Sequence, residues 1–443
     1  MSGATLDRLD ARLRDNTAVV GVIGLGYVGL PVACLIADSG LRVVGVDVKP
    51  EVAAQVNAGT STIRGREPGL EALLREQVSA GRLRATTSYA DLASADLVLI
   101  SVETPVSDDH QPAYDALRRA CEQLGPVLAE GALVVVESTV SPGTMERVVT
   151  PALERSTGRV AGSGFFVGHC PERVMPGRLL RNLRELSRVV GGQTPAVAAC
   201  MTRFYGRYVR GDLDPTDLLT AELVKTVENA YRDVNIAFAN QVALIAEHAG
   251  GDAWKVRELV NKSPGRNMLL PGAGVGGHCI PKDPWLLVSA APDDVGAPLL
   301  QAARSLNEGM PSHVADLALR LLAEEGIDPG SAVVAVLGYA YLEDSDDSRH
   351  SPSAAAVAAL EGAGCQVRIH DPYVAGHQGD LGSVLSGADC ALLMVAHSQY
   401  RDLAPEWLAA HLRRPLLVDG RRVFEPEALT AAGLRHRTVG RGR

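Results

Sequence analysis

The sequence of 443 residues has few lysines, no long apolar run and no block of basic residues. Its net charge of −9 argues against a nucleic-acid or membrane-surface partner. The longest apolar runs, such as 132–136 and 391–395, have strand length, far short of the roughly 20 residues that span a membrane. The charged N-terminal segment lacks the apolar stretch of a signal peptide, so we expect a cytoplasmic protein.

Cysteine spacing excludes the common metal and redox motifs. None of the cysteines forms a CxxC pair, as expected of reduced thiols. Two His-Cys pairs, 169–170 and 278–279, suggest a four-ligand zinc site. Adjacent side chains in extended structure point to opposite faces, so we expect no metal site. The cysteines are Cys34, Cys121, Cys170, Cys200, Cys279, Cys365 and Cys390.

A dinucleotide-binding pattern follows the N-terminal segment, in a chain long enough for two or three domains. The apolar run 18–23 leads into GLGYVG, an apolar helical stretch ends near Gly40, and the run 41–46 ends at Asp47. The glycines permit a tight turn and close pyrophosphate approach. The charge of Asp47 would repel a 2′-phosphate, which predicts NAD. The predicted cofactor-binding residues are Gly24, Gly26, Tyr27, Val28, Gly29 and Asp47.

Three further apolar runs, 97–102, 133–136 and 165–167, each end in a polar segment marked by proline. Ligands of an open α/β sheet bind at the carboxyl ends of its strands, where these segments fall. We therefore assign Thr104, Ser138 and Thr139 to cofactor binding as well. Ordinary strand-to-helix turns are the alternative, since Ser, Thr and Pro also start helices.

The stretch 216–249 is free of proline and predicts one long helix, capped by Asp217. Glu222, Lys225 and Asn229 fall on one of its faces. Lys225 and Asn229 are suited to donate to one developing oxyanion, and a solvated Glu–Lys pair is the commoner alternative. Apolar residues lie on more than one side, so we expect burial between domains or subunits.

A glycine- and proline-rich loop spans Pro271 to Trp285, with the sequence PGAGVGGHCIPKDPW. Such a loop is costly in conformational entropy unless its shape matters. Cys279 is a candidate nucleophile, because nearby positive charge favours the thiolate, and Lys282 and Asp283 follow it. A surface loop with an incidental cysteine is an equal alternative on this stretch alone.

A second α/β pattern begins after about residue 330, with strands expected over 332–337, 367–369, 391–395 and 415–418. It has no GxGxxG, so this domain should bind something other than a second dinucleotide. Arg349 lies in the polar loop EDSDDSRHSP and is suited to a bidentate phosphate contact; we place it among the cofactor-binding residues. An arginine paired with its neighbouring aspartates is the alternative.

Together these motifs resemble the UDP-glucose/GDP-mannose dehydrogenase family. The resemblance implies an α/β fold with two Rossmann-like doubly wound domains, joined by a long central helix in a helical dimerisation region. We expect an NAD-binding domain over 1–205, the central region over 206–325 and a nucleotide-sugar-binding domain over 326–443. The motifs are GLGYVGLP (24–31), EPGL (67–70), ESTVSPGT (137–144), PERVMPG (171–177), the Glu222/Lys225/Asn229 helix, GGHCIPKDP (276–284), SDDSRHSP (345–352) and DGR (419–421).

Members of that family oxidise the C6 alcohol of a nucleotide sugar to a carboxylate with two NAD, and they form dimers. By resemblance, Cys279 attacks the aldehyde, Lys225 and Asn229 hold the oxyanion, and Thr139 and Asp283 position water or relay a proton. Glu172 then assists thioester hydrolysis. The substrate-binding residues implied are Glu172, Arg173, Lys225, Asn229, Arg266, Gly276, Gly277 and Arg421.

The segment GVGGHCIPKDPW resembles dehydrogenases of UDP-N-acetylhexosamines, ManNAc or GlcNAc. Leu342 departs from the family, because a Lys that reaches the diphosphate is common there. UDP- or TDP-glucose therefore stays an alternative substrate. A two-electron 3-hydroxyacid dehydrogenase is an alternative of another class, and it needs no thiol nucleophile, so Cys279 discriminates. A non-catalytic NAD-binding protein is a third, which intact Lys225, Asn229, Cys279 and Asp283 disfavour.

Overall fold

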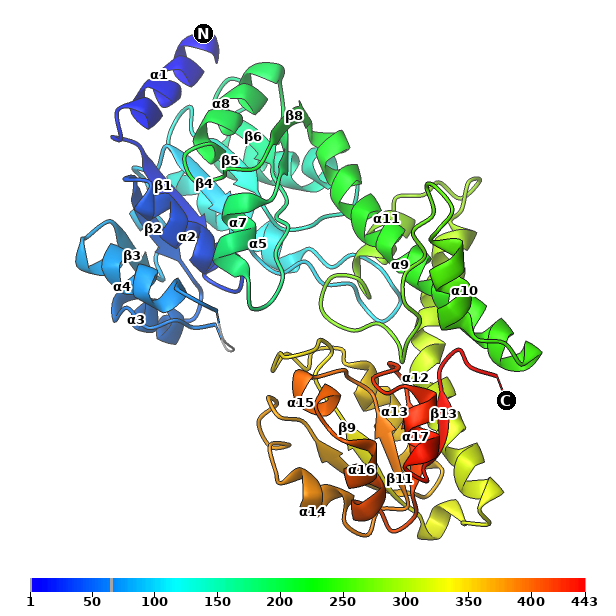
Figure 1. Cartoon of the computed structure of the whole chain (residues 1–443). Helices are drawn as coiled ribbons and strands as arrows, with labels where there is room; N and C mark the ends of the chain where they lie inside the picture. The colour runs from blue at the N-terminus through cyan, green and yellow to red at the C-terminus, as the bar shows by residue number, and fades with distance from the viewer. Residues whose placement is uncertain (1, 64–66, 443) are drawn as a thin grey trace. The chain divides into compact units, whose positions relative to one another are not determined.

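The computed structural model describes residues 2–63 and 67–442 and divides the chain into two compact units (Figure 1). The first unit comprises Met1–Glu228 with Trp285–Asp294, and the second comprises Asn229–Pro284 with Val295–Arg443. Among the described residues, no helix is long and apolar enough to cross a membrane.

An eight-stranded sheet forms the centre of the first unit, in the order β3-β2-β1-β4-β5-β6-β7-β8. All neighbours are parallel except β6 and β7. The order reverses between β1 and β4, which is where open α/β sheets bind ligands. The strands are β1 (Val19–Ile23), β2 (Arg42–Val46), β3 (Leu83–Thr86), β4 (Leu97–Ile100), β5 (Leu133–Val136), β6 (Phe166–His169), β7 (Arg188–Gly192) and β8 (Leu213–Asp217).

Helices cover both faces of this sheet, so its central strands are buried on both sides. Val20 and Val22 of β1 belong to one core, which includes α2, and Val19 and Ile23 belong to the other, which includes α5 and α6. Alternate residues of a strand point to opposite faces, which explains this division. The helices are α1 (Ser2–Arg14), α2 (Gly29–Asp38), α3 (Pro50–Asn57), α4 (Leu70–Ser79), α5 (Asp115–Leu124), α6 (Thr150–Thr157), α7 (Leu179–Glu185) and α8 (Pro195–Tyr205), with a π-helical turn over Met145–Val149.

The long helix predicted over 216–249 is present as α9 (Leu218–Ala249). Asp217 caps it as expected, because its Oδ1 accepts a hydrogen bond from the Thr220 N–H at 2.8 Å. The first two predicted helical residues instead end strand β8, which pairs with β7. This short, largely exposed strand carries polar residues and a proline, as edge strands tolerate.

A parallel five-stranded sheet forms the centre of the second unit, in the order β10-β9-β11-β12-β13. This is a second doubly wound order, reversing between β9 and β11, so the predicted α/β fold with two Rossmann-like sheets is confirmed. The strands are β9 (Val333–Leu337), β10 (Gln366–His370), β11 (Cys390–Leu393), β12 (Leu416–Asp419) and β13 (Arg435–Thr438). The helices are α10 (Ala253–Val260), α12 (Pro298–Glu324), α13 (Pro352–Gly362), α14 (Leu381–Leu385), α15 (Ser398–Arg401), α16 (Pro405–His411) and α17 (Pro426–Ala431); α11 (Asp283–Val288) begins in the second unit and ends in the first.

Candidate active-site residues in the two units

The three glycines after β1 have different surroundings. Gly24 has φ +87°, and a Cβ there would lie 2.5 Å from the carbonyl oxygen of Ser101. A Cβ on Gly29 would lie 1.9 Å from the carbonyl oxygen of Gly24, so this glycine lets α2 start close against the turn. A Cβ on Gly26 would meet no atom of the described residues within 4 Å. Gly24 and Gly29 therefore serve the turn and the packing, and Gly26 leaves the backbone open to a ligand.

Asp47 follows β2 and faces the same glycine turn. Its Oδ2 accepts the N–H of Leu25 at 2.9 Å, and its Oδ1 accepts the N–H of Lys49 at 3.0 Å. Tyr27 donates from its hydroxyl to Glu67 Oε1 at 3.0 Å, and Val28 precedes the first residue of α2. Each carboxylate oxygen has more than one lone pair, so Asp47 keeps capacity for ribose hydroxyls.

Thr104, Ser138 and Thr139 lie together at the carboxyl ends of β4 and β5. The Thr104 hydroxyl donates to the carbonyl of Thr139 at 2.6 Å, and the Ser138 hydroxyl donates to the carbonyl of Val102 at 2.5 Å. The two loops are therefore joined side by side at the carboxyl ends of neighbouring strands, next to the point between β1 and β4 where the strand order reverses. This is the edge at which the sequence predicted them.

Glu172 and Arg173 follow β6. Glu172 is buried, and its Oε2 has no hydrogen-bond partner among the described residues. Arg173 forms a two-pronged ion pair with Glu228 of α9 and donates to the Ser187 hydroxyl at 2.8 Å. Both guanidinium edges of Arg173 therefore engage protein groups, whereas Glu172 keeps one buried carboxylate oxygen without a hydrogen-bond partner among the described residues.

Glu222 and Lys225 are both buried on α9 within the first unit. The Glu222 carboxylate accepts two backbone N–H groups, from Gly143 at 2.6 Å and from Met145 at 2.7 Å. Burial raises the pKa of Glu222 to about 7, while those N–H groups lower it. The surface Glu–Lys pair considered as an alternative is wrong for this glutamate, because its partners are backbone groups of the loop after β5.

Asn229 and Asp283 meet in the second unit. The Asn229 Nδ2 donates to Asp283 Oδ2 at 2.5 Å, and Lys282 Nζ lies 2.7 Å from Asp283 Oδ1. Asp283 is buried and its N–H donates to the carbonyl of Cys279 at 2.8 Å. A turn thus links the half-buried Cys279 to the first residue of α11. The segment 279–283 therefore carries the thiol, ammonium and carboxylate groups, and α9 contributes the Asn229 amide.

The loop before Cys279 is fixed by contacts that only glycine permits. A Cβ on Gly276 would lie 2.7 Å from the carbonyl oxygen of His350, and Gly277 has φ +89° with the Tyr341 ring against it. Arg421 donates from Nε to the carbonyl of Met394 at 2.9 Å and from Nη2 to that of Gly274 at 3.2 Å. Arg421 therefore supports the loop.

Arg349 and Arg266 also lie in the second unit. Arg349 contacts Asp347 from Nε at 2.9 Å and from Nη2 at 2.5 Å, which is the alternative considered from the sequence. Arg266 is exposed and donates to the carbonyl of Pro264 at 2.9 Å. The contacts of Arg266 stay within its own loop and do not join it to the other predicted residues.

Contacts between distant segments add residues that the sequence alone did not single out. Asn240 of α9 accepts the N–H of Gly272 at 2.9 Å and donates to Asn307 of α12 at 2.9 Å. Glu137, directly after β5, is buried; burial raises its pKa, and Tyr205 donates to it at 2.9 Å. An acid ending an apolar run is the one sequence signal for Glu137.

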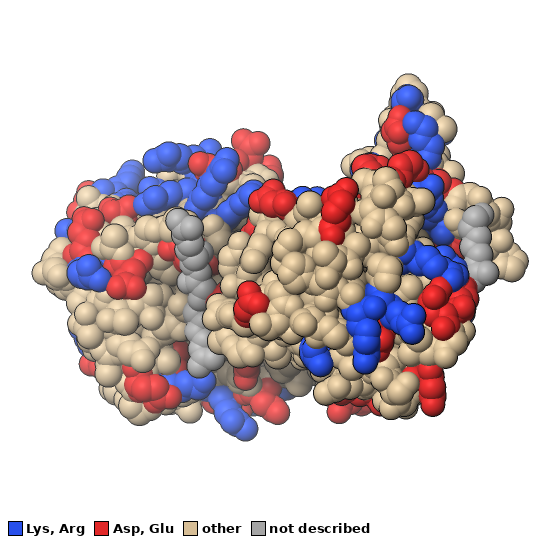
Figure 2. Space-filling model, turned by 60° about the horizontal axis from the view of Figure 1, so that its bottom comes forward, with Lys and Arg blue, Asp and Glu red and all other residues tan. Residues whose placement is uncertain are grey.

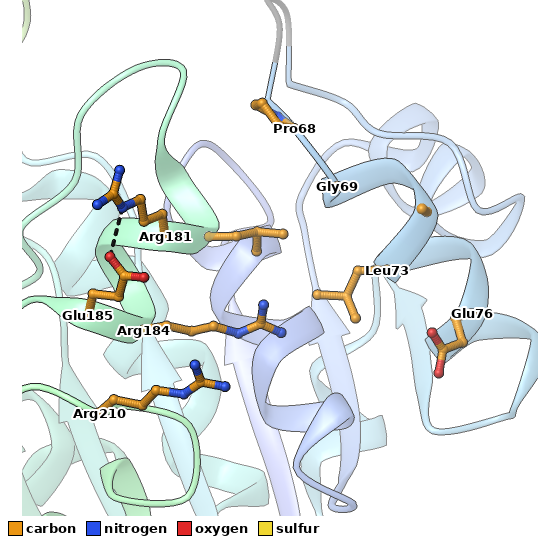
Figure 3. A pocket seen from close by; sticks show the side chains of 10 residues that line it. Pro68, Gly69, Leu73, Glu76, Arg181, Arg184, Glu185 and Arg210 are labelled. Carbon is orange, nitrogen blue, oxygen red and sulfur yellow. Dashed lines mark hydrogen bonds and ion pairs between the residues drawn. The ribbon is translucent and has the colours of Figure 1, made fainter.

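A shallow groove of about 520 Å³ lies between α4 and α7 in the first unit (Figure 3). The side chains of Arg184 and Arg210 extend toward it, whereas the Arg181 guanidinium turns away and donates to Glu185 at 2.7 Å. None of the predicted site residues lines it. On the face drawn in Figure 2, basic and acidic side chains are intermixed.

Comparisons with known proteins identify the family. Residues 18–209, 219–309 and 335–426 match the NAD binding, central and UDP binding domains of the UDP-glucose/GDP-mannose dehydrogenase family. The UDP-N-acetyl-D-mannosamine dehydrogenase of Pyrococcus horikoshii is 40% identical over 96% of this chain and 99% of its own. Its solved structure superimposes with a TM-score of 0.90, at 39% identity over 96% and 99% of the two chains. The NDP-N-acetyl-D-galactosaminuronic acid dehydrogenase of Ralstonia nicotianae is 36% identical over 96% and 100%. The chain therefore belongs to the UDP-glucose/GDP-mannose dehydrogenase family.

Proposed function

We propose that the protein is an NAD-dependent nucleotide-sugar 6-dehydrogenase that oxidises a C6 alcohol to a carboxylate in two steps. The arrangement around Cys279 carries the proposal. The carbonyl of Cys279 accepts the N–H of Asp283, and the Asp283 carboxylate contacts both Asn229 and Lys282. A two-electron alcohol dehydrogenase needs no thiol in the segment that leads to this carboxylate, whereas a four-electron enzyme needs one to capture the aldehyde.

The residues after β1 suit a dinucleotide. Gly26 leaves open space beside the backbone, Gly24 and Gly29 close the turn, and Asp47 faces it. The helix that follows supplies N–H groups for a pyrophosphate. A bound NAD would supply the hydride acceptor, with one NAD used for each of the two oxidations. Gly24, Gly26, Tyr27, Val28, Gly29, Asp47, Thr104, Ser138 and Thr139 would hold it, and Arg349 is proposed for a phosphate.

Two oxidations and one hydrolysis would give the carboxylate. The C6 hydroxyl loses its proton and the C6 carbon loses a hydride to give an aldehyde, and Lys225 and Asn229 stabilise the developing negative charge on oxygen. The Cys279 thiolate adds to the aldehyde carbon, forming a thiohemiacetal. Loss of a second hydride and the hydroxyl proton gives a thioester. Water then breaks the carbon–sulfur bond, leaving a carboxylate and the thiol, with Glu172 assisting and Thr139 and Asp283 positioning water or relaying protons.

Replacing the nucleophile tests this chemistry. Cys279→Ser should stop release of the acid or accumulate a serine ester on the enzyme, because an ester hydrolyses more slowly than a thioester. Intact-mass spectrometry after exposure to NAD and the sugar nucleotide would detect the adduct. Cys365→Ser, at a buried thiol of the second unit, is the matched control. Undiminished acid formation by Cys279→Ser would overturn the four-electron scheme.

For the substrate we propose a UDP-N-acetylhexosamine, ManNAc or GlcNAc. The matching of residues 335–426 to a UDP binding domain and the names of the similar proteins support this choice. The sugar contacts proposed are Glu172, Arg173, Lys225, Asn229, Arg266, Gly276, Gly277 and Arg421. UDP- or TDP-glucose is the competing substrate, because Leu342 stands where related enzymes commonly have a lysine. Competition among these sugar nucleotides in one assay would decide between them.

We also propose a cytoplasmic homodimer with the domain boundaries 1–205, 206–325 and 326–443. One face of α9 supports dimerisation, since its large apolar side chains recur every four or seven residues and stay exposed in the single chain. Two copies related by a twofold axis would bury this face against each other. The exposed side chains are Leu219 (50%), Leu223 (37%), Val227 (46%), Tyr231 (70%), Phe238 (58%) and Ile245 (58%).

A further inference from the structure

Glu222 lies on α9 and holds the loop that follows β5, which is distant from it in the sequence. Its two carboxylate oxygens each accept one backbone N–H, Oε2 from Gly143 and Oε1 from Met145. These residues are 79 and 77 positions away in the chain. Glu222 is 1% exposed, so water does not compete for these bonds. Lys225 follows on the next turn of the same helix.

Other contacts fix the rest of this loop. Ser138 and Thr139 are joined to the loop after β4, as described above. The N–H of Ser141 donates to the Tyr114 hydroxyl at 2.7 Å, and the Thr144 hydroxyl donates to the Ser141 carbonyl at 2.6 Å. The segment 138–145 is thus bonded at its start to the loop after β4 and at its end to Glu222.

Glu222 differs from the neutral anchors of this loop because it titrates. The groups around it are Tyr114, whose pKa burial raises, Arg147, whose guanidinium donates to the Pro142 carbonyl at 2.6 Å, and Lys225 one turn onward. Burial raises the pKa of Glu222 to about 7. A protonated carboxyl keeps one good acceptor oxygen and gains an O–H donor, so it cannot serve two N–H donors equally.

We propose that Glu222 is a positioning residue that holds the loop carrying Ser138 and Thr139 in its cofactor-binding conformation, and that the ionisation of Glu222 makes this conformation depend on pH. The charged carboxylate holds the loop through both backbone hydrogen bonds, and the protonated carboxyl holds it less firmly. Only the link from the loop to the cofactor rests on the proposed function. The link from Glu222 to the loop rests on the two backbone hydrogen bonds alone.

A purely stabilising role for Glu222 does not explain why its charged form makes both hydrogen bonds to the loop. The raised pKa means that the folded state binds a proton more tightly than the unfolded chain does. The contribution of Glu222 to stability is therefore lost as pH rises through about 7. The charged form that makes both hydrogen bonds is the one that costs stability, as expected when a group serves the geometry of a site.

The test uses Glu222→Gln in the full-length protein. Glutamine has nearly the same shape and does not titrate, but its amide nitrogen cannot accept an N–H. Asp96→Asn is the matched control, because Asp96 accepts the N–H of Val19 at 2.9 Å and pairs with Arg12 just before β4. Two measurements are made between pH 6 and 8.5: amide hydrogen exchange of residues 138–149 and the dissociation constant of NAD.

In the parent protein, exchange of this segment, corrected for intrinsic rates, and the dissociation constant should both rise as pH falls through about 7. At every pH, Glu222→Gln should show exchange as fast as that of the parent at pH 6, with a roughly tenfold weaker NAD complex than the parent at pH 8.5 and no step near neutrality. Asp96→Asn should keep the step. Unchanged exchange in Glu222→Gln, or a step that persists in it, would overturn the proposal.

The same measurements separate this proposal from the proposed activity. If no sugar nucleotide is oxidised but exchange and NAD binding follow the expected pattern, the activity is wrong and the role of Glu222 stands. If the enzyme oxidises sugar nucleotides but exchange over 138–149 ignores Glu222, the role of Glu222 is wrong and the activity stands.

Discussion

Asn229 donates from Nδ2 to Asp283 Oδ2 at 2.5 Å, although 54 residues separate them in the chain. The other carboxylate oxygen lies 2.7 Å from Lys282 Nζ, so both Asp283 oxygens face positive or N–H groups. The contact orients the Asn229 amide, because Nδ2 must point to the carboxylate. Asn229, which we propose to hold an oxyanion, and Asp283, which we propose to relay a proton, therefore position each other.

Removing the charge of Asp283 should slow turnover. Asp283→Asn should lower kcat by roughly 10²–10³-fold while the KM of the sugar nucleotide changes only a few-fold, because proton transfer is lost and binding is kept. Steady-state rates at saturating NAD measure this. Asp252→Asn is the control, because it removes a carboxylate charge in the second unit while the amide oxygen of the introduced side chain can still cap α10, and it should leave kcat unchanged. A kcat like that of the parent enzyme would contradict the role given to Asp283.

Filling the open position in the glycine turn should weaken NAD binding without unfolding the protein. Gly26→Ala adds a Cβ that meets no atom within 4 Å in the described part of the chain, so the melting temperature should stay close to that of the parent. The dissociation constant of NAD should rise at least about tenfold, since close backbone approach to the pyrophosphate is blocked. Calorimetric titration measures it. Gly362→Ala, at an equally open position ending α13, should leave NAD binding unchanged.

A charge on the exposed face of α9 should separate subunits. Phe238→Glu places a carboxylate among apolar side chains that the proposed dimer buries, and an unpaired buried charge is costly. Light scattering at micromolar concentration should then report the mass of one chain, against two for the parent. Val160→Glu, at another exposed apolar residue outside α9, should keep two. A monomeric parent protein would contradict the dimer itself.

Acid should destabilise the protein through His169. Burial lowers the pKa of His169 from 6.5 to about 4, so the folded state holds it neutral while the unfolded chain binds a proton. Stability is therefore lost as pH falls from 6.5 toward 4, by up to about 3 kcal/mol.

Replacing this ring isolates its contribution. His169→Asn keeps a donor for the carbonyl of Val136, which the ring contacts at 2.9 Å, and removes the titration. Urea unfolding at several pH values should show a flatter loss of stability in this variant. His248→Asn, at an exposed histidine in the last turn of α9, should follow the parent curve. Equal slopes in the parent and His169→Asn would refute the assignment.

Much of the first sheet could be predicted because its strands are apolar and its turns carry glycine. The run 18–23, the glycines and Asp47 form a local pattern whose spacing is set by backbone geometry alone. Strand β8 escaped prediction, since LDPTD is polar and contains proline, and its pairing with β7 is a tertiary contact.

The contacts that define the candidate site were harder to predict from the sequence than the strands were. Periodicity places Glu222, Lys225 and Asn229 on one face of α9, but it does not tell which loop Glu222 binds. The pairing of Asn229 with Asp283 likewise depends on folding, because α9 and the cysteine loop are separate in sequence. The expected roles of these residues rest on the resemblance to a family. The structure adds which groups contact Glu222 and Asn229.

A four-electron oxidation of a nucleotide sugar should produce two NADH for each sugar, so the proposed function can be tested by counting the NADH formed per sugar consumed. UDP-GlcNAc, UDP-ManNAc, UDP-glucose, TDP-glucose and GDP-mannose would each be supplied in limiting amount, with NAD in excess. We predict two NADH for each sugar consumed, with a UDP-N-acetylhexosamine preferred. One NADH per sugar would contradict the role of Cys279, and no NADH from any of the five would contradict the activity.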